Sequence, residues 1–245
     1  MSNKPYLSVI LPAYDEEARI IPSLIKRHEY LEKQNYSYEV LIVNDGSTDK
    51  TKELVLEKIK DWPHFQLIDN KINKGKGAVV KQGMLSAQGK WRLFMDVDES
   101  VTINEIERLW PYTQDFEIII GSRYTKGGKV TKKQPLIRRI ISRGGNLLIQ
   151  ILIAWGIKDT QCGFKMFAEH AAKEIFSLQT MERWSFDMEL IAIAKKHGYN
   201  IKEVPVVWQE QAGSKLGAAK AAIRSLRDVF IIWYNKVTGK YNQKN

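Results

Sequence analysis

The chain of 245 residues lacks the features that mark secreted and membrane-spanning proteins. It has one cysteine, Cys162, which excludes an internal disulfide and favours a reducing compartment. Its first residues show neither the long apolar stretch nor the small-residue cleavage site of a signal peptide. The longest apolar run, Leu147–Trp155, is broken by Gln150 and falls far short of the roughly 20 residues that span a bilayer. We therefore expect a cytoplasmic protein.

Acidic residues are scarce in two segments of a basic chain. Residues 123–143 contain many lysines and arginines and no acid, and the segment after Lys215 has only Asp228. The formal net charge is +10, from 38 basic and 28 acidic residues. Such a surface is either simply solvated or binds an anionic partner: nucleic acid, a membrane surface or a phosphorylated substrate.

Two common nucleotide-binding signatures are absent as well. No GxGxxG follows the first apolar run and no GxxxxGK[ST] occurs anywhere, which disfavours dinucleotide binding and P-loop chemistry. The chain also shows no RNA-binding or helix-turn-helix signature, so nucleic acid is not an expected partner.

What the chain does contain is a regular alternation of short apolar runs with helical patterns. The first half predicts five strands, over Leu7–Leu11, Tyr38–Val43, Phe65–Ile68, Trp91–Met95 and Phe116–Ile120. Helices are expected between them, at about Glu16–Lys33, from Ser47 or Thr48 to Ile59, at Gly77–Ala87 and near Ile103–Trp110. This order implies βαβ units and an α/β fold with a mostly parallel sheet flanked by helices.

The regular alternation of strand and helix patterns ends after Gly121. A loop at Thr125–Lys133 precedes the further expected elements: helices at about Pro135–Trp155, Glu169–Phe176, Phe186–His197 and Gly217–Trp233, and strands at Gly163–Phe167 and Ile201–Trp208. No repeat or linker separates independent units, so we expect one domain over 1–245, in three parts: 1–121, 122–216 and 217–245.

Phe94-Met-Asp-Val-Asp98 is the most informative segment. Strand alternation places Asp96 and Asp98 on one side and Val97 on the other. Two close carboxylates repel each other unless a cation lies between them, and hard ions such as Mg²⁺ or Mn²⁺ suit oxygen ligands and substrate phosphates. The alternative is a turn or a helix cap, for which aspartate is also favoured.

Two glycine-containing turns carry similar alternatives. In Val43-Asn-Asp-Gly-Ser-Thr-Asp49 the turn and helix cap are sufficient explanations, but Asp45 can also accept hydrogen bonds from a base or ribose. Asn73-Lys-Gly-Lys-Gly-Ala78 opens a helix and is either a solvated turn or a phosphate site that includes Lys76. Because ligands of open α/β sheets bind at the carboxyl ends of strands, these segments and Asp96 and Asp98 would meet at one edge.

Together the segments LPAYDEE, VNDGSTD, NKGKGAV and MDVDES resemble the GT-A fold of the inverting, nucleotide-sugar-dependent glycosyltransferases of family 2. The resemblance covers roughly residues 7–210 and makes 1–121 the nucleotide-sugar half and 122–216 the acceptor half. It implies that Asp96 and Asp98 bind a divalent metal, Mg²⁺ or Mn²⁺, and the diphosphate. The other implied donor-binding residues are Pro12, Ala13, Tyr14, Glu16, Asp45, Lys76, Val97 and Lys215.

The second half resembles enzymes that move a sugar onto a polyprenyl phosphate. Gly121-Ser-Arg-Tyr124, Asp159-Thr-Gln-Cys-Gly-Phe-Lys165, Arg183-Trp-Ser-Phe-Asp187 and Gly213-Ser-Lys-Leu216 look most similar to dolichyl-phosphate β-glucosyltransferases, whose donor is UDP-glucose. This implies a glucosyltransferase that works peripherally on the cytoplasmic face of a membrane. Eukaryotic members carry an N-terminal membrane anchor, and this sequence does not show one.

The chemistry of a phosphate acceptor agrees with the basic residues. A sugar hydroxyl needs a carboxylate base, whereas a phosphate monoester is already largely dianionic at neutral pH and needs only cations to hold it. Arginine offers bidentate contacts to phosphate, and the predicted acceptor-phosphate residues are Arg123, Arg138, Arg139 and Arg143. Arg139 and Arg143 would share one helix face.

Asp187 has three possible roles: a general base, a residue that orients the donor sugar or an arginine, or the N-cap of a helix at Met188–Lys196. With Asp98 and Arg123 it completes the predicted catalytic set. The alternative functions are transfer to a saccharide or diacylglycerol hydroxyl with Asp187 as base, use of a GDP-mannose donor, and a non-enzymatic nucleotide-sugar or membrane-binding module.

The remaining candidates have structural explanations. Cys162 is expected to pack in the interior, and the core is the default for the aromatic residues Trp184, Trp208, Trp233 and Tyr234. The run Leu147–Trp155 and the FIIWYNK segment with its basic neighbours can instead lie at a membrane surface.

Overall fold

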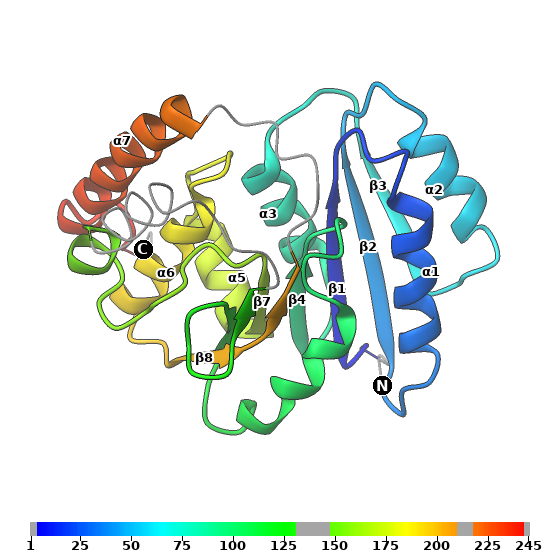
Figure 1. Cartoon of the computed structure of the whole chain (residues 1–245), viewed down its shortest axis with the longest axis horizontal. Helices are drawn as coiled ribbons and strands as arrows, with labels where there is room; N and C mark the ends of the chain where they lie inside the picture. The colour runs from blue at the N-terminus through cyan, green and yellow to red at the C-terminus, as the bar shows by residue number, and fades with distance from the viewer. Residues whose placement is uncertain (1–3, 131–147, 210–217, 243–245) are drawn as a thin grey trace.

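A seven-stranded sheet forms the centre of the molecule in the computed structural model, which describes residues 4–130, 148–209 and 218–242 (Figure 1). Its strand order is β3-β2-β1-β4-β7-β5-β8, and β7 alone among these strands runs antiparallel to its neighbours. The strands are β1 Leu7–Ala13, β2 Tyr38–Asp45, β3 Phe65–Asn70, β4 Trp91–Met95, β5 Ile118–Ser122, β7 Phe164–Ala168 and β8 Ile201–Pro205. The predicted α/β fold with a mostly parallel sheet is confirmed.

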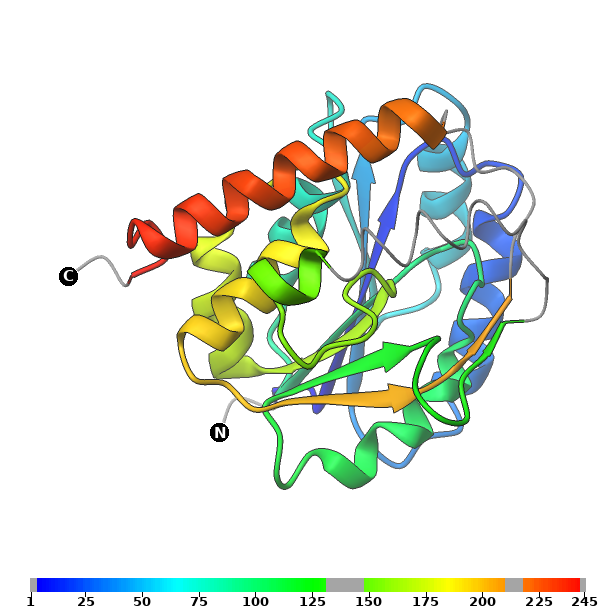
Figure 2. The same cartoon turned by 60° about the vertical axis from the view of Figure 1, so that its left-hand side comes forward.

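Helices cover both faces of this sheet (Figures 1 and 2). One face carries α1 Ile20–Leu31, α2 Thr51–Ile59 and the 3₁₀ segments η1 Ile103–Arg108 and η2 Trp110–Tyr112. The other carries α3 Lys76–Ser86, α5 Glu169–Leu178, α6 Phe186–Lys196 and α7 Ala218–Val237. A small parallel pair, β6 Lys129–Val130 and β9 Val207–Trp208, forms a second sheet, and residues 148–152 are helical.

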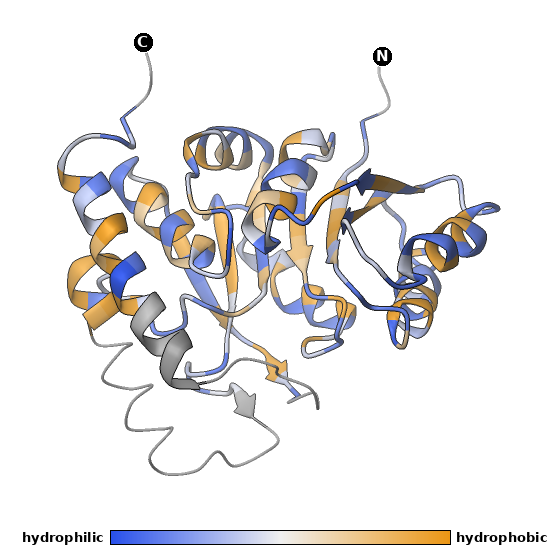
Figure 3. Ribbon diagram, turned by 90° about the horizontal axis from the view of Figure 1, so that it is seen from above, coloured by the Kyte–Doolittle hydropathy of each residue, from blue (hydrophilic) through white to orange (hydrophobic). Residues whose placement is uncertain are grey.

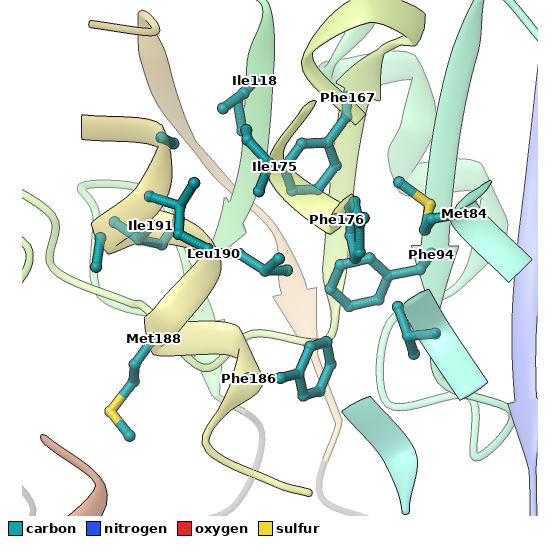
Figure 4. Close-up of a cluster of buried hydrophobic side chains, with 14 of the residues drawn as sticks. Met84, Phe94, Ile118, Phe167, Ile175, Phe176, Phe186, Met188, Leu190 and Ile191 are labelled. Atoms are coloured by element: carbon teal, nitrogen blue, oxygen red, sulfur yellow. The ribbon is translucent and has the colours of Figure 1, made fainter. Parts of the chain in front are cut away.

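Strand alternation divides the core into two layers. In β1, Val9 and Leu11 pack with the α1 and α2 side, while Ile10 packs with the α3, α5 and α6 side. Figure 4 shows the second layer, where aromatic rings from β4, β7 and α5 meet the apolar face of α6. Strands buried on both faces read as continuous apolar runs, which is why they were visible in the sequence. The hydropathy colouring follows the same division, with apolar strands between helices of mixed character (Figure 3).

Several predicted boundaries were wrong for local reasons. Helix α1 begins at Ile20 rather than near Glu16, because the amides of residues 15–17 donate to side chains of the loop that follows β2 and of the first residue of α2. The segment near Ile103–Trp110 consists of two short 3₁₀ turns. The expected strand Ile201–Trp208 divides at Val206 between two sheets.

The predicted caps of α2 were also wrong. The helix begins at Thr51, and Lys50 before it makes no capping bond with its side chain. Of the candidates Ser47, Thr48 and Asp49, only Asp49 accepts from the first helical amide, that of Thr51, at 3.0 Å. Ser47 and Thr48 are engaged instead with Asp15, because the two loops at this end of the sheet bind each other.

Two predicted helices extend beyond the described residues. The portion of Pro135–Trp155 before Leu148 and the start of Gly217–Trp233 lie outside them. Among the residues that the structure does describe, no helix is both long enough and apolar enough to cross a bilayer.

Candidate active site

The carboxyl ends of the parallel strands and the amino end of β7 meet at one edge of the sheet. Because β7 is antiparallel to β4, Met95 pairs with Phe164, so the residues just before β7 lie beside those just after β4. A side chain on Gly163 would collide with the Asp96 carboxylate, at 2.3 Å from its Oδ2 atom. This edge therefore brings together chain segments from both halves of the sequence.

Two loops at this edge are locked together by reciprocal hydrogen bonds. Ser47 Oγ accepts from the Asp15 amide at 3.0 Å, and Asp15 Oδ1 accepts from the Thr48 amide at 2.8 Å. The Glu16 and Glu17 amides donate to Thr51 Oγ1 and Asp49 Oδ2 at 2.8 and 3.0 Å. Asp15 is held in the left-handed region, at φ 51°. The loops fix Tyr14, whose ring is exposed, at the end of β1.

Asp45 organises the glycine-containing loop before α3. Its two carboxylate oxygens accept from the amides of Lys74 and Gly75, at 2.7 and 2.9 Å. Burial raises the pKa of Asp45 against the lowering effect of these two bonds. Gly75 has φ 100°, and a side chain there would lie 2.5 Å from the Glu182 carbonyl oxygen. The contact of Asp45 with a nucleoside stays a prediction; its contact with this loop is an additional role.

The loop places Lys76 beside the Asp-x-Asp segment. Lys76 Nζ lies 2.5 Å from Asp96 Oδ1 and 5.2 Å from the centre of the Trp184 ring. Asp98 Oδ1 accepts from the Ser100 amide, and Val97 between the two acids is buried. Burial alone would lower the pKa of Lys76, but the charges of Asp96 and Asp187 outweigh it and raise that pKa. The negative charge of Asp98 also helps to raise the pKa of Lys76.

A buried arginine supports the chain just after β4. Arg27 is fully buried in α1; its Nη2 donates to the Asp96 carbonyl at 2.7 Å and its Nη1 pairs with Glu99. Glu99 has φ 60°, a backbone conformation that needs such support outside glycine. Arg27 therefore fixes the path of the Asp-x-Asp segment from behind.

Asp187 is deeply buried and is paired with Lys165. Lys165 Nζ donates to Asp187 Oδ1 and, at 2.6 Å, to the Cys162 carbonyl, and it lies 5.4 Å from the centre of the Phe94 ring. Burial raises the pKa of Asp187, although Lys165 and Lys76 act to lower it. The N-cap alternative is wrong, because α6 begins at Phe186 and Asp187 lies inside its first turn.

These pairs form an alternating series of charges, Lys165–Asp187–Lys76–Asp96. Lys165 forms a direct ion pair with Asp187, and Lys76 forms one with Asp96. The charge of Asp187 acts on Lys76 and so relates the two pairs. We name these four residues the charge series. It connects the strand end that was expected to bind metal with the start of α6.

Arg123 lies at the end of β5 and is held by Asp159. Its Nε and Nη2 donate to the two Asp159 oxygens, each at 2.8 Å, and its amide donates to Oδ2 at 2.9 Å. Burial would raise the pKa of Asp159, but the guanidinium of Arg123 outweighs it and holds that pKa below its usual value. The guanidinium also lies over the rings of Tyr124 and Trp208. Its contact with an acceptor phosphate stays a prediction.

Several predicted site residues are not placed by the structure. The predicted phosphate-binding residues Arg138, Arg139 and Arg143, and the donor-binding Lys215, lie outside the described residues. Pro12 and Glu16 are partly exposed and Ala13 is buried at the end of β1. Glu16 pairs with Arg19 on its own turn.

Sequence reasoning missed the partners that hold these residues. Lys165, Asp159 and Arg27 received no role, although a charged residue inside an apolar pattern was a visible signal for Lys165 and Arg27. The expected interior position of Cys162 is confirmed: it is buried and free, and burial raises the pKa of its thiol to about 12.

Replacing Lys165 with methionine should lower the free energy of unfolding by about 3–5 kcal/mol, because it leaves the buried Asp187 charge without its partner. Urea unfolding measures this loss, and the double variant K165M/D187L should recover much of it. Lys173→Met, which breaks an exposed pair with Glu169, is the matched control and should change little. Equal losses for K165M and K173M would contradict the importance of burial.

The Arg123–Asp159 pair predicts a loss of stability in acid. Since the folded pKa of Asp159 lies below the unfolded value of about 3.9, the pair contributes fully above that pH. Its contribution disappears as pH falls through the folded pKa. The difference in unfolding free energy between wild type and Asp159→Asn should therefore be constant near neutrality and shrink below about pH 4. A difference that stays unchanged down to pH 2.5 would contradict this.

A protein-family model described as glycosyl transferase family 2 matches residues 8–176, more than half of the chain. A dolichyl-phosphate β-glucosyltransferase of Trichomonas vaginalis is 39% identical over 237 residues, which cover 91% of this chain and 72% of that protein. The enzyme of the same name from Dictyostelium discoideum is 35% identical, with coverage of 98% and 77%. The one from Homo sapiens is 32% identical, with coverage of 96% and 77%.

Solved structures agree on the fold. Glucosyl-3-phosphoglycerate synthase from Mycobacterium tuberculosis, crystallised with Mn²⁺, UDP-glucose and phosphoglyceric acid, superposes with a TM-score of 0.70 at 16% identity; the match covers 98% of this chain and 81% of that one. TarS from S. aureus with UDP-GlcNAc gives a TM-score of 0.59 at 18% identity, with 92% and 66% covered. The expected GT-A fold is confirmed, and the chain belongs to glycosyl transferase family 2, among relatives of the dolichyl-phosphate β-glucosyltransferases.

Proposed function

We propose that this protein transfers glucose from UDP-glucose to a polyprenyl phosphate, with inversion at the anomeric carbon. The relatives that carry the name dolichyl-phosphate β-glucosyltransferase match nearly the whole chain, which supports this acceptor and this sugar. A neighbour of the same fold was crystallised with UDP-glucose, which supports the donor.

The burial and pairing of Asp187 is the observation that carries the proposal. A hydroxyl acceptor needs a carboxylate that is free to take its proton, yet Asp187 is buried and engaged by Lys165. A phosphate acceptor needs no base, because its second pKa is about 6. Asp187 then acts on charge and position: with Lys165 on one side and Lys76 on the other, it holds Lys76 at the donor side of the site.

Asp96 and Asp98 are suited to hold a divalent metal ion such as Mg²⁺ or Mn²⁺. Both are partly exposed acids at a strand end, their oxygens are hard ligands, and substrate phosphates complete the coordination of such ions. When bound, the ion supplies positive charge to the diphosphate of the donor. Lys76 contributes a second cation, and Lys215 is proposed to contribute a third. Pro12, Ala13, Tyr14, Glu16 and Asp45 are proposed to hold the nucleoside.

The acceptor phosphate is proposed to bind Arg123 with Arg138, Arg139 and Arg143. One phosphate oxygen attacks the anomeric carbon from the face opposite the diphosphate. The carbon–oxygen bond to UDP breaks as the new bond forms, and UDP leaves with the bonding electrons. No proton has to move, so the cations make the main contribution to catalysis. They neutralise the negative charge that develops on the departing diphosphate. Because the acceptor is a lipid, we propose that the reaction takes place at the surface of a membrane; its cytoplasmic face stays a prediction.

Incubation with UDP-[¹⁴C]glucose, Mn²⁺ and a short polyprenyl phosphate should yield a label that partitions into organic solvent and is released by mild acid. Asp96→Asn should reduce the rate by roughly 100-fold or more, since it removes charge that holds the diphosphate and its cations. Asp115→Asn, an acid at the opposite end of the sheet, is the matched control and should leave the rate unchanged.

Parallel reactions with GDP-mannose and with diacylglycerol test the alternatives. A label in lipid only from GDP-mannose would overturn the donor, and a label only on the hydroxyl acceptor would overturn the phosphate acceptor. No labelled lipid from any donor would overturn transfer to a lipid altogether.

A further inference from the structure

Helix α7 buries one apolar face and exposes another. Val229 and Ile232 are buried in the core shared with α6. The opposite side carries large apolar residues with exposed fractions between 40% and 61%: Leu226, Phe230, Trp233, Tyr234 and Val237. Their spacing of three and four places them along one stripe of the helix. We call these five residues the α7 surface. The expectation that Trp233 and Tyr234 fill the core was wrong.

A neighbouring segment adds two more exposed apolar side chains. Ile151 and Trp155 have exposed fractions of 58% and 72%. The segment that carries them is joined to the end of α7, because Lys236 Nζ donates to the Ile153 carbonyl at 3.3 Å. Apolar side chains of this size are rarely left in water side by side on a monomer without a partner.

Basic residues lie on α7 and on the elements packed against it. Arg227 and Lys240 are exposed on α7 and just after it. Lys195 Nζ donates to the Trp155 carbonyl at 2.6 Å and Lys196 Nζ to the Lys236 carbonyl at 3.0 Å. The one acid after Lys215, Asp228, accepts a hydrogen bond from Ser185. An apolar stripe with tryptophan, tyrosine and flanking cations is the composition of helices that lie in the interface of a membrane with anionic lipids.

A second copy of the chain fits this surface less well. A symmetric pair would bring identical patches together, so the cations of one molecule would face those of the other. An anionic bilayer attracts the same cations instead, because its surface potential is negative.

Helix α7 is also connected to the candidate active site. The bond from Ser185 to Asp228 ties α7 to the residues just before α6, two positions from Asp187. Trp184, the next residue back, lies over Lys76 and is itself exposed. Figures 1 and 2 show the amino end of α7 toward the end of the molecule where β1 and β2 finish. A bilayer along α7 would therefore lie near the site.

We propose that the exposed face of α7, with Trp155 beside its carboxyl end, binds the surface of an anionic phospholipid bilayer. The apolar side chains enter the headgroup region, and the surrounding lysines and arginines contact lipid phosphates. The biological reason rests on the proposed function, because a polyprenyl phosphate is held in such a surface. The binding itself needs neither donor nor turnover.

Flotation with vesicles of phosphatidylcholine, with and without 30% phosphatidylglycerol, tests the proposal. Wild type should float with the anionic vesicles and be released by 0.5 M NaCl. The triple variant F230Q/W233Q/Y234Q should bind at least about 10-fold more weakly, since it removes apolar area that enters the lipid. Leu56→Gln with Leu85→Gln, on exposed positions of α2 and α3, is the matched control and should bind as wild type.

Three outcomes would overturn the proposal: unchanged flotation of the triple variant, equal loss in the control, or a wild-type dimer in sedimentation equilibrium that the triple variant abolishes. Glucosyl transfer to a water-soluble, short-chain phosphate separates this proposal from the proposed function. Transfer that persists in the triple variant while flotation is lost supports both. Absence of transfer in wild type with intact flotation would remove the proposed function alone.

Discussion

The charge series Lys165–Asp187–Lys76–Asp96 is the constraint on which the candidate site depends. Each charge in it is stabilised by the opposite charge beside it, so an interior lysine and an interior aspartate become tolerable. Its two ends differ in exposure: Lys165 and Asp187 are buried, whereas Lys76 and Asp96 are partly exposed. The charge of the buried Asp187 acts on Lys76, and the exposed end carries the cation and the carboxylate that are proposed to bind the donor diphosphate and its metal ion.

The fold explains why this series exists. Strand β7 enters the sheet antiparallel between β4 and β5, so it delivers Lys165 from the second half of the chain next to the strand that ends just before Asp96. Helix α6 follows with Asp187 in its first turn, and the loop held by Asp45 delivers Lys76. Arg123 and Asp159 repeat the arrangement one strand further along, with the arginine as the more exposed member. The proposed donor and acceptor sides are thus both built from paired charges at the same edge of the sheet.

The fold and one edge of the candidate site could be predicted from the sequence, because short segments of the chain carry the necessary patterns. Buried parallel strands read as apolar runs, and the segments ending in Tyr14, Asp45 and Asp98 carry their polar residues at strand ends, which fixes the fold and one edge of the site. The direction of β7 could not be predicted, because an apolar run of five residues looks the same in either orientation. Without that direction, the pairing of Lys165 with Asp187 across 22 positions stays hidden. The prediction for helix α7 failed for a different reason. Apolar residues occupy both of its faces, so periodicity alone could not show that Trp233 faces outward.

The most direct test of the charge series is calorimetric titration of UDP into wild type and Lys76→Met, each with and without Mn²⁺. Lys76 pairs with Asp96, and its ammonium group is proposed to pair with the diphosphate when the donor binds. It should therefore matter for binding before any chemistry occurs. The account predicts that wild type binds UDP more tightly with Mn²⁺ and that Lys76→Met binds it at least about 10-fold more weakly in its presence. Equal affinity of the two proteins, with thermal unfolding unchanged, would contradict the account.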